Sequence, residues 1–97
     1  MIVRIVPMHF RKEALSSFLA LFDEHRNDIA GQPGCRNLQL VQAEQDECAI
    51  STISQWDAPE DLEAYRNSAL FQHIWPATKA LFSASPAASS HTVRWAS

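Results

Sequence analysis

The sequence predicts an α+β domain with the ferredoxin-like order β-α-β-β-α-β, in which an antiparallel sheet carries its helices on one face. Short runs rich in β-branched residues alternate with longer segments whose apolar residues recur every three or four positions. A polar stretch at 43–47 joins two of the short runs directly, which is typical of a hairpin. The 97 residues suffice for a single small domain spanning 1–97.

Residues 2–6 are predicted as the first strand because four of the five are apolar. Pro7 is expected to end this strand. Apolar residues between 15 and 29 then follow helical spacing, so we expect a long helix that begins near 10–13. Gly31 is expected to end this helix as a left-handed C-cap, before a Pro-Gly turn.

The two strands of the hairpin are predicted at 35–42 and 48–56. If the hairpin folds about residues 44–45, Cys35 pairs near Ser54, far along the ladder from Cys48. A disulfide between the two cysteines is therefore not expected.

The aromatic-rich stretch after the hairpin predicts two consecutive helices. Asp57 and Glu60 have the spacing of a capping box, and Pro59 falls in the first turn, where its missing N–H is not needed. Ser68 is expected to cap the second helix. Pro76 is expected to kink that helix or to end its first part.

The last strand is predicted at 91–95, after a loop rich in Ala, Ser and Pro. A sheet with helices on one face leaves its other face open to water. The first strand is apolar on both sides, and the other strands add Cys35 or Val41, and Ile53 or Ile50, to the open face. Each buried apolar side chain contributes roughly 1.5–3 kcal/mol, so we expect a homodimer packed sheet against sheet.

Composition narrows the classes of partner. The formal net charge is −3 and no run of Lys or Arg occurs, so neither nucleic acid nor an anionic membrane is expected as a partner. The apolar N-terminal run is short and contains Arg4, which is unlike a signal peptide, and no segment is long enough to span a membrane. The expected location is the cytoplasm.

Three segments together resemble a known family. They are PGCRNLQL at 33–40, ISQWDAPEDLEAYRNS at 53–68 and ALFQHIWPATKALF at 69–82. This pattern resembles the antibiotic biosynthesis monooxygenase superfamily of dimeric α+β barrels. The resemblance implies a homodimer whose two sheets form a barrel, with an apolar pocket between the sheet and helices of each protomer. It also implies oxidation of hydroquinone-like aromatic substrates by molecular oxygen without a cofactor, since the substrate supplies the electrons.

The resemblance directs attention to polar and aromatic residues near that pocket. We expect His73 and Tyr65 as catalytic residues, and Trp56, Trp75, Phe71, Ser54, Thr52 and His9 as substrate-binding residues. His73 is chosen because histidine titrates near neutral pH. Simpler interpretations remain open: Trp56 as a core residue, Tyr65 with its hydroxyl in water, and both histidines on the surface.

Departures from the family pattern limit what the resemblance implies. Thr52 stands where some oxygenase members have Asn. The haem-degrading branch needs a His where this chain has Trp75 and an Asn where it has Pro7, so haem degradation is disfavoured. The alternative to an enzyme is a non-catalytic dimeric module that binds a small apolar ligand, or only itself. This alternative predicts a pocket filled by the protein's own Phe71, Trp75 and Phe82 side chains.

No metal or other cofactor is expected. The four histidines show no metal-binding spacing, and no cysteine pair joins them. Only two glycines are present, Gly31 and Gly34, so a phosphate-binding glycine loop is not expected either. The expected partners are a small aromatic molecule and a second copy of the chain.

Overall fold

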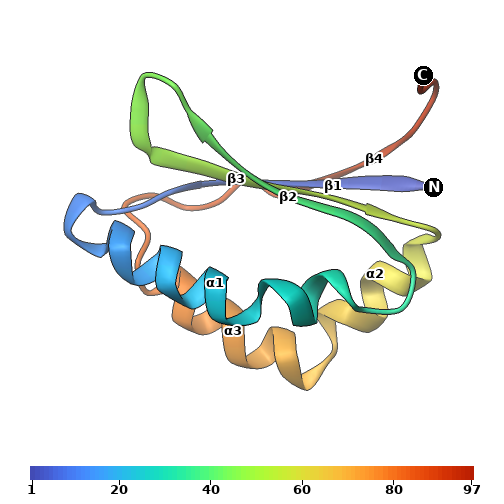
Figure 1. The fold of residues 1–97 in the computed structure, drawn as a ribbon, viewed down its shortest axis with the longest axis horizontal. Helices are drawn as coiled ribbons and strands as arrows, with labels where there is room; N and C mark the ends of the chain where they lie inside the picture. Colours follow the sequence, from blue (N-terminus) through green and yellow to red (C-terminus); the bar gives the residue numbers. More distant parts are fainter.

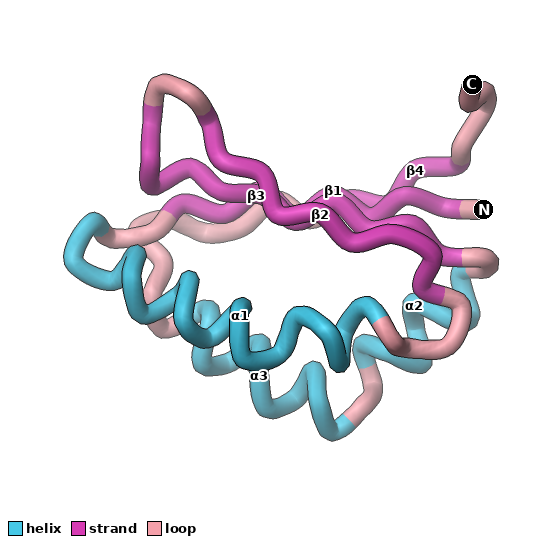
Figure 2. The backbone as a smooth tube through the Cα atoms, viewed as in Figure 1, coloured by secondary structure: helices cyan, strands magenta, loops and turns pink.

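In the computed structural model, which describes residues Met1–Ser97, four strands form one antiparallel sheet and the helices cover only one of its faces (Figure 1). The elements are β1 (Ile2–His9), a 3-10 turn (Lys12–Ala14), α1 (Leu15–Ala30), β2 (Cys35–Ala43), β3 (Asp46–Trp56), α2 (Pro59–Arg66), α3 (Ala69–Lys79) and β4 (Ser89–Thr92). The strand order is β2-β3-β1-β4. The predicted ferredoxin-like α+β fold is confirmed, and Figure 2 shows its two layers.

β1 continues through Pro7, so the expected end of the strand at this residue is wrong. Backbone groups of successive residues point to opposite sides of a strand. The Phe10 N–H points toward β3, where it donates to the Cys48 carbonyl. The nitrogen of Pro7 therefore points toward β4, whose pairing with β1 has already ended at Ile5. No ladder hydrogen bond is lost at Pro7, which is the position where a strand tolerates proline.

The left-handed glycine is not the one expected. Gly31 follows α1 as predicted, but its φ is −84°. Gly34 has a φ of +81°, and a Cβ at this position would collide with the Asp61 side chain of α2. Backbone conformation and close packing both require glycine at 34, where the turn brings β2 beside the start of α2.

The helix caps differ from expectation at α2 and match it at α3. Ala58 is the N-cap of α2 and makes no side-chain hydrogen bond. Asp57 is not the cap because its carboxylate accepts two hydrogen bonds from the Arg36 guanidinium, at 2.8 and 2.6 Å. The Ser68 hydroxyl caps α3 as predicted and accepts a hydrogen bond from the Phe71 N–H at 3.2 Å.

The two remaining differences concern where elements end. α3 continues through Pro76 to Lys79, so of the two expected effects of this proline, a kink or an end, the end does not occur. β4 begins at Ser89 rather than at His91. No helix of the structure combines the length and the apolar character needed to cross a membrane.

The hairpin turns at residues 44–45 as predicted, but its register differs. Cys35 lies opposite Trp56 rather than near Ser54, since irregular pairing at both ends of β2 shifts the ladder. Both Cys35 and Cys48 are free thiols.

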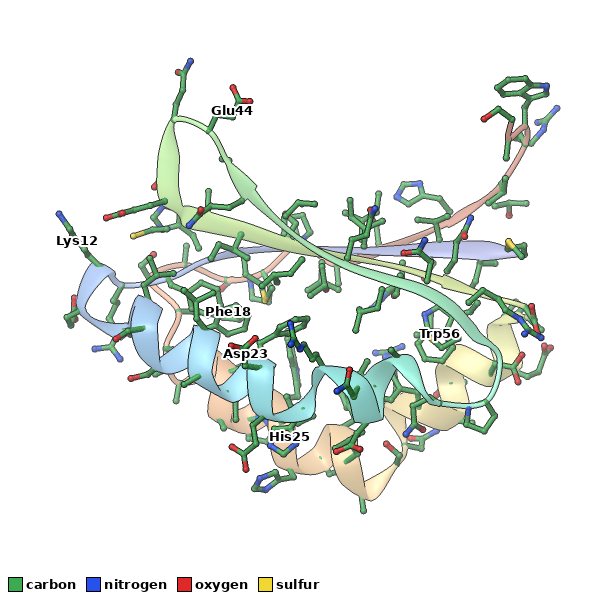
Figure 3. The ribbon with its side chains drawn as sticks, in the orientation of Figure 1. Lys12, Phe18, Asp23, His25, Glu44 and Trp56 are labelled. Carbon is green, nitrogen blue, oxygen red and sulfur yellow. The ribbon has the colours of Figure 1, made fainter.

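The two faces of the sheet differ in cover. On the helix side, Met8, Phe10, Phe18 and Ile50 form a buried cluster, and Figure 3 shows Phe18 between α1 and the sheet. The opposite face has no helix over it (Figure 1). Strand alternation assigns Val3, Ile5, Val41 and Ile53 to it, and we call these four residues the free-face cluster.

Candidate functional site

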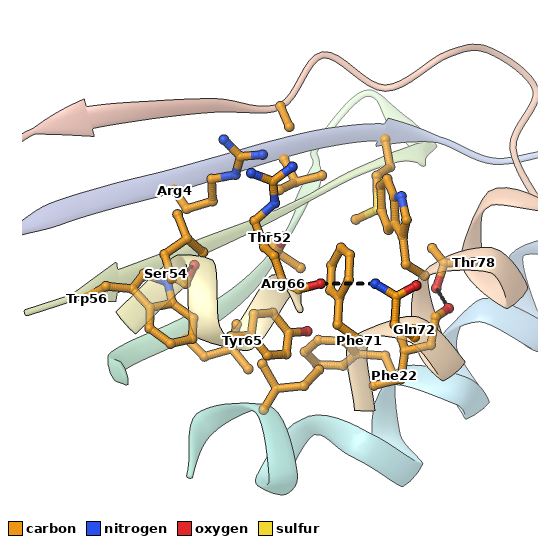
Figure 4. Close-up of a pocket in the computed structure, with 18 of the residues that line it drawn as sticks. Arg4, Phe22, Thr52, Ser54, Trp56, Tyr65, Arg66, Phe71, Gln72 and Thr78 are labelled. Carbon is orange, nitrogen blue, oxygen red and sulfur yellow. Dashed lines mark hydrogen bonds between the residues drawn. The ribbon is translucent and has the colours of Figure 1, made fainter. Parts of the chain in front are cut away.

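A cavity of about 500 Å³ lies between the helices and the covered face of the sheet (Figure 4). Strands β1, β2 and β3 line one side, and helices α1, α2 and α3 line the other. This volume falls within the range of small-molecule sites, roughly 300–1,000 Å³. Charged, hydroxyl-bearing and aromatic side chains in its lining include Arg4, Thr52, Ser54, Trp56, Glu63, Tyr65, Arg66, Phe71 and Trp75.

Aromatic side chains form a continuous wall along this cavity. Trp56 stacks on Tyr65 with ring centroids 5.4 Å apart and planes at 20°. Tyr65 meets Phe71 edge-on at 5.2 Å, and Phe71 stacks on Trp75 at 5.7 Å. Phe71 and Trp75 share one face of α3 because four residues are close to one helical turn. We call these four residues the aromatic wall, and it offers a flat ring several π-faces to pack against.

The end of β3 supplies both part of the wall and a polar group. Strand alternation points Thr52, Ser54 and Trp56 to the same side, and all three line the cavity. Trp56 is only 1% exposed, and its indole N–H donates to the Ser54 Oγ at 2.9 Å. The hydroxyl therefore satisfies a buried donor and fixes the orientation of the indole.

Tyr65 contributes a hydroxyl that keeps its proton. Burial, with a smaller contribution from the charge of Cys35, raises the pKa of Tyr65 to about 12. At neutral pH the side chain is thus a hydrogen-bond donor and not a general base. Figure 4 shows its hydroxyl directed toward the Phe71 side of the cavity.

Two guanidinium groups reach the same cavity from separate elements, Arg4 from β1 and Arg66 from the end of α2 (Figure 4). The Arg66 Nη1 lies 3.6 Å from the Glu63 Oε2. Arg4 instead donates to the neutral Ser90 Oγ at 3.0 Å. Burial and then the nearby charge of Arg66 lower the pKa of Arg4, with Glu63 acting in the opposite direction.

The charged end of the cavity lies at the edge of the molecule. A second hollow of about 330 Å³ runs between α2 and the paired strands β1 and β4. Leu62, Glu63 and Arg66 line both this hollow and the main cavity. Arg66 therefore borders both hollows, and Arg4 donates to Ser90, which lines the second one.

The structure brings together most, but not all, of the residues that the sequence indicated. The cavity is lined by Thr52, Ser54, Trp56, Tyr65, Phe71 and Trp75. His73, the expected acid or base, does not line it. Its exposed ring meets His25 of α1 edge-on, with centroids 5.5 Å apart. The expectation that His73 faces the cavity is wrong, because Ile74 and Trp75 occupy the inward face of α3.

His9 also lies outside the cavity, so its expected place in substrate binding is wrong. Met8 and Phe10 on either side of it point into the core, and strand alternation turns His9 the other way. Its Nδ1 lies 2.5 Å from the Ser83 Oγ and its Nε2 lies 2.8 Å from the Asp46 Oδ2. The His9 contact is the main cause that lowers the pKa of the Asp46 carboxyl. This exposed cluster joins β1, the hairpin and the segment after α3.

Sequence reasoning missed the charged end of the cavity. Arg4 carried a signal, because it is a lone charge in an apolar strand and alternates with Val6 and Met8 on the inward face. Arg66 carried none, since its three-residue spacing from Glu63 is typical of a solvent-exposed helix pair.

The donor set does not favour a metal. No group of three or more His, Cys, Asp and Glu side chains is placed to share an ion. The only carboxylate that lines the cavity is Glu63, and it lies next to the Arg66 guanidinium. Hydroxyls, guanidinium groups and aromatic rings suit an organic ligand better than a cation.

The family model for antibiotic biosynthesis monooxygenase matches residues 1–76 of the chain. The chain belongs to this family. The match includes β1, α1, β2, β3, α2 and most of α3, and so contains every lining residue of the cavity except Thr78 and Ala88. No functionally curated protein matches the chain in sequence.

Solved structures share the fold of this antibiotic biosynthesis monooxygenase family member. A solved antibiotic biosynthesis monooxygenase is 18% identical over 96% of this chain and 98% of its own, with a TM-score of 0.90. Rv0793 from Mycobacterium tuberculosis is 18% identical over 99% and 98%, with a TM-score of 0.89. SnoaB, a cofactor-independent oxygenase from Streptomyces nogalater, is 17% identical over 98% and 94%, with a TM-score of 0.87.

Proposed function

We propose that the chain is a cofactor-independent monooxygenase that oxidises a small, hydroquinone-like aromatic molecule in the cavity between sheet and helices. The observation that carries the proposal is the aromatic wall beside two hydroxyl groups, those of Tyr65 and Ser54. Membership in the family supports the oxygenase class, and SnoaB, which shares the fold, is a cofactor-independent oxygenase. Because one fold hosts many functions, the residues that line the cavity support the proposal more strongly than the fold does.

The proposed reaction needs no electron source other than the substrate. With 1,4-naphthalenediol as substrate, one atom of O₂ replaces a ring hydrogen to give hydroxynaphthoquinone, and the other atom leaves as water. Loss of a hydroxyl proton from the diol makes the ring a better reductant. In this proposal Tyr65 and Ser54, which both line the cavity, would donate hydrogen bonds to an oxygen of the substrate, and the aromatic wall would pack against its ring.

Two other functions receive less support. A module filled by its own side chains does not fit, because Phe71 and Trp75 are walls of an open cavity and Phe82 packs on Phe10 with centroids 5.3 Å apart. Haem degradation remains disfavoured, since Trp75 occupies the cavity wall where that branch needs a histidine. A module that binds an aromatic ligand without oxidising it is the alternative that the following experiment separates.

The test is oxygen uptake with naphthalene and anthracene hydroquinones, compared with their autoxidation. We expect uptake above autoxidation and incorporation of one labelled atom from ¹⁸O₂ into the quinone. Tyr65→Phe should lower the rate by about 10-fold or more, as loss of a donor to a developing oxyanion does. His73→Ala, which alters a histidine outside the cavity, should match the native rate. Uptake equal to autoxidation across the panel, with the ligand still bound, would favour the binding module.

We also propose that the chain is a homodimer that pairs through the helix-free faces of its sheets. The free-face cluster of Val3, Ile5, Val41 and Ile53 supports this arrangement, because a second sheet would remove these side chains from water. Among these four side chains Val41 is the most exposed, at 40% in the isolated chain.

A further inference from the structure

We propose that the ligand of the cavity carries one anionic oxygen group, either a carboxylate or a phenolate, and that Arg4 and Arg66 bind this group. This inference rests on the proposed function, because it names the class of substrate for the same cavity. The substrate class is a flat aromatic anion whose ring lies against the aromatic wall.

The first argument is the convergence of two like charges. Arg4 and Arg66 are far apart in the sequence, yet the fold brings both to one cavity (Figure 4). Each guanidinium repels the other, and Arg4 in addition loses part of its hydration. Because the Arg66 side chain is 45% exposed, water screens part of this repulsion, and the remainder is unfavourable in an empty cavity. An anion bound between the two groups would offset both the repulsion and the lost hydration.

The second argument is the charge balance of the lining. The charged residues that line the cavity are Arg4, Glu63 and Arg66. Glu63 lies 3.6 Å from Arg66 and offsets one positive charge. Tyr65 is neutral at physiological pH because its pKa is about 12. One positive charge remains without a partner, which matches a ligand with a single negative charge.

The third argument is unused hydrogen-bonding capacity. A guanidinium has five N–H donors. Arg4 directs one nitrogen to the Ser90 Oγ at 3.0 Å, and this hydroxyl carries no charge. Guanidinium groups bind carboxylates and other oxyanions through short, charge-assisted hydrogen bonds that neutral oxygens do not match.

The two arginines would also favour ionisation of a bound phenol, for which the cavity has no histidine base. No histidine lines the cavity, so no side chain of that kind can remove the proton of a bound phenol. A nearby positive charge lowers the pKa of a bound hydroxyl. Arg4 and Arg66 would thus favour the phenolate directly, with the proton passing to water at the open edge.

The test is binding of two naphthalene ligands of nearly equal shape, 2-naphthoate and the neutral 2-naphthamide, measured by titration calorimetry at neutral pH. We expect the native protein to bind 2-naphthoate about tenfold more tightly, which corresponds to about 1.4 kcal/mol. Arg4→Gln and Arg66→Gln should each lose this preference and keep their affinity for 2-naphthamide, which shows that the cavity is still folded. Arg26→Gln removes the same charge from an exposed position on α1 and should keep the preference.

A third ligand, 2-naphthol, separates the two kinds of anion. If its ultraviolet spectrum in the cavity is that of the naphtholate, and Arg4→Gln abolishes this spectrum, the arginine pair binds a phenolate. A preference for 2-naphthoate with neutral bound 2-naphthol assigns a carboxylate. Equal affinities for 2-naphthoate and 2-naphthamide with neutral bound 2-naphthol, or no binding of any of the three, would overturn the inference.

These results are independent of turnover. If the protein prefers 2-naphthoate but no hydroquinone of the panel gives oxygen uptake, the oxygenase proposal is rejected and the anion site is kept. Oxygen uptake from neutral hydroquinones without any charge preference would keep the oxygenase and reject the anion site.

Discussion

Tyr65 illustrates how the position of one side chain decides which chemistry it can perform. Its ring lies between Trp56 and Phe71, with centroids at 5.4 and 5.2 Å. This packing removes the phenol from water and raises its pKa to about 12. The hydroxyl is therefore fixed as a donor over the whole physiological range, which suits stabilisation of a substrate oxyanion and excludes proton abstraction.

We expect stability to fall as pH rises from about 10 to about 12, the interval between the unfolded and folded pKa values of Tyr65. In this interval the unfolded chain has lost a proton that the folded chain retains, so the unfolded state is favoured as pH rises. Urea denaturation at several alkaline pH values should show this fall, and Tyr65→Phe should reduce it.

Tyr65 is the only tyrosine, so the ultraviolet spectrum of the phenolate reports on it alone. The folded protein should show no phenolate at pH 10, near the ordinary tyrosine pKa of 10.0. Half-complete ionisation of the folded protein at that pH would contradict the burial argument.

The sequence could identify the aromatic residues of the cavity on regular elements, and of its two arginines it gave a signal only for Arg4. Phe71 and Trp75 follow from helical spacing, and the same spacing excludes His73 once Ile74 is placed inward. Choosing His73 by its usual pKa therefore neglected the geometry of the helix. Arg66 could not be assigned from sequence, because its role depends on how α2 sits against β1.

At the scale of elements, the Ser68 hydroxyl bridges α2 and α3, next to a hydrogen bond from the Gln72 Nε2 to the Arg66 carbonyl at 3.1 Å. The Ser68 Oγ accepts from the Phe71 N–H at 3.2 Å and donates to the Tyr65 carbonyl at 2.6 Å. It thereby links two residues of the aromatic wall through the backbone. The N-cap of α2, in contrast, is Ala58, whose φ of −147° and ψ of 156° already suit a capping residue.

Exchanging these caps should change stability in opposite directions. Ser68→Ala should destabilise the protein by about 1 kcal/mol through loss of the cap. Ala58→Ser should stabilise it by up to about 1 kcal/mol, because the new hydroxyl can accept from a free N–H of the first turn. Urea denaturation of both variants measures the changes. Equal stabilities of Ser68→Ala and the native protein would show that backbone packing, and not the hydroxyl, holds the junction.

The prolines show why some element boundaries could not be predicted from sequence. In a strand, a proline costs a ladder hydrogen bond only where a neighbouring strand would accept from its missing N–H. At Pro7 no strand does so, because β4 stops pairing at Ile5. The length of β4 depends on residues that lie more than 80 positions after Pro7 in the sequence. The sequence around Pro7 therefore does not predict where this pairing stops. Pro76 is tolerated inside α3, whose inward residues Ile74 and Thr78 remain buried.

At the scale of the whole molecule, the helix-free side of the sheet is concave. Figure 1 shows the β2–β3 hairpin rising from one end of this side and the C-terminal segment rising from the other. Figure 3 places Glu44 at the raised tip of the hairpin. Within the free-face cluster, Ile5 lies directly opposite Ile53 on the two central strands of the sheet, β1 and β3. A concave apolar face of this kind fits the sheet of a second copy.

If the proposed homodimer forms through this face, we expect Ile53→Lys to give a monomer. In a two-fold dimer each substitution occurs twice on the same self-complementary face, so the variant would bury two unpaired ammonium groups near the centre of the interface. Leu19→Lys is the matched control, because Leu19 is 38% exposed on α1, on the helix side of the molecule. Sedimentation equilibrium at micromolar concentration should give a dimer for the native protein and for Leu19→Lys, and a monomer for Ile53→Lys. A native protein that sediments as a monomer would show that the free-face cluster is stable in water, and the barrel arrangement would then have to be abandoned.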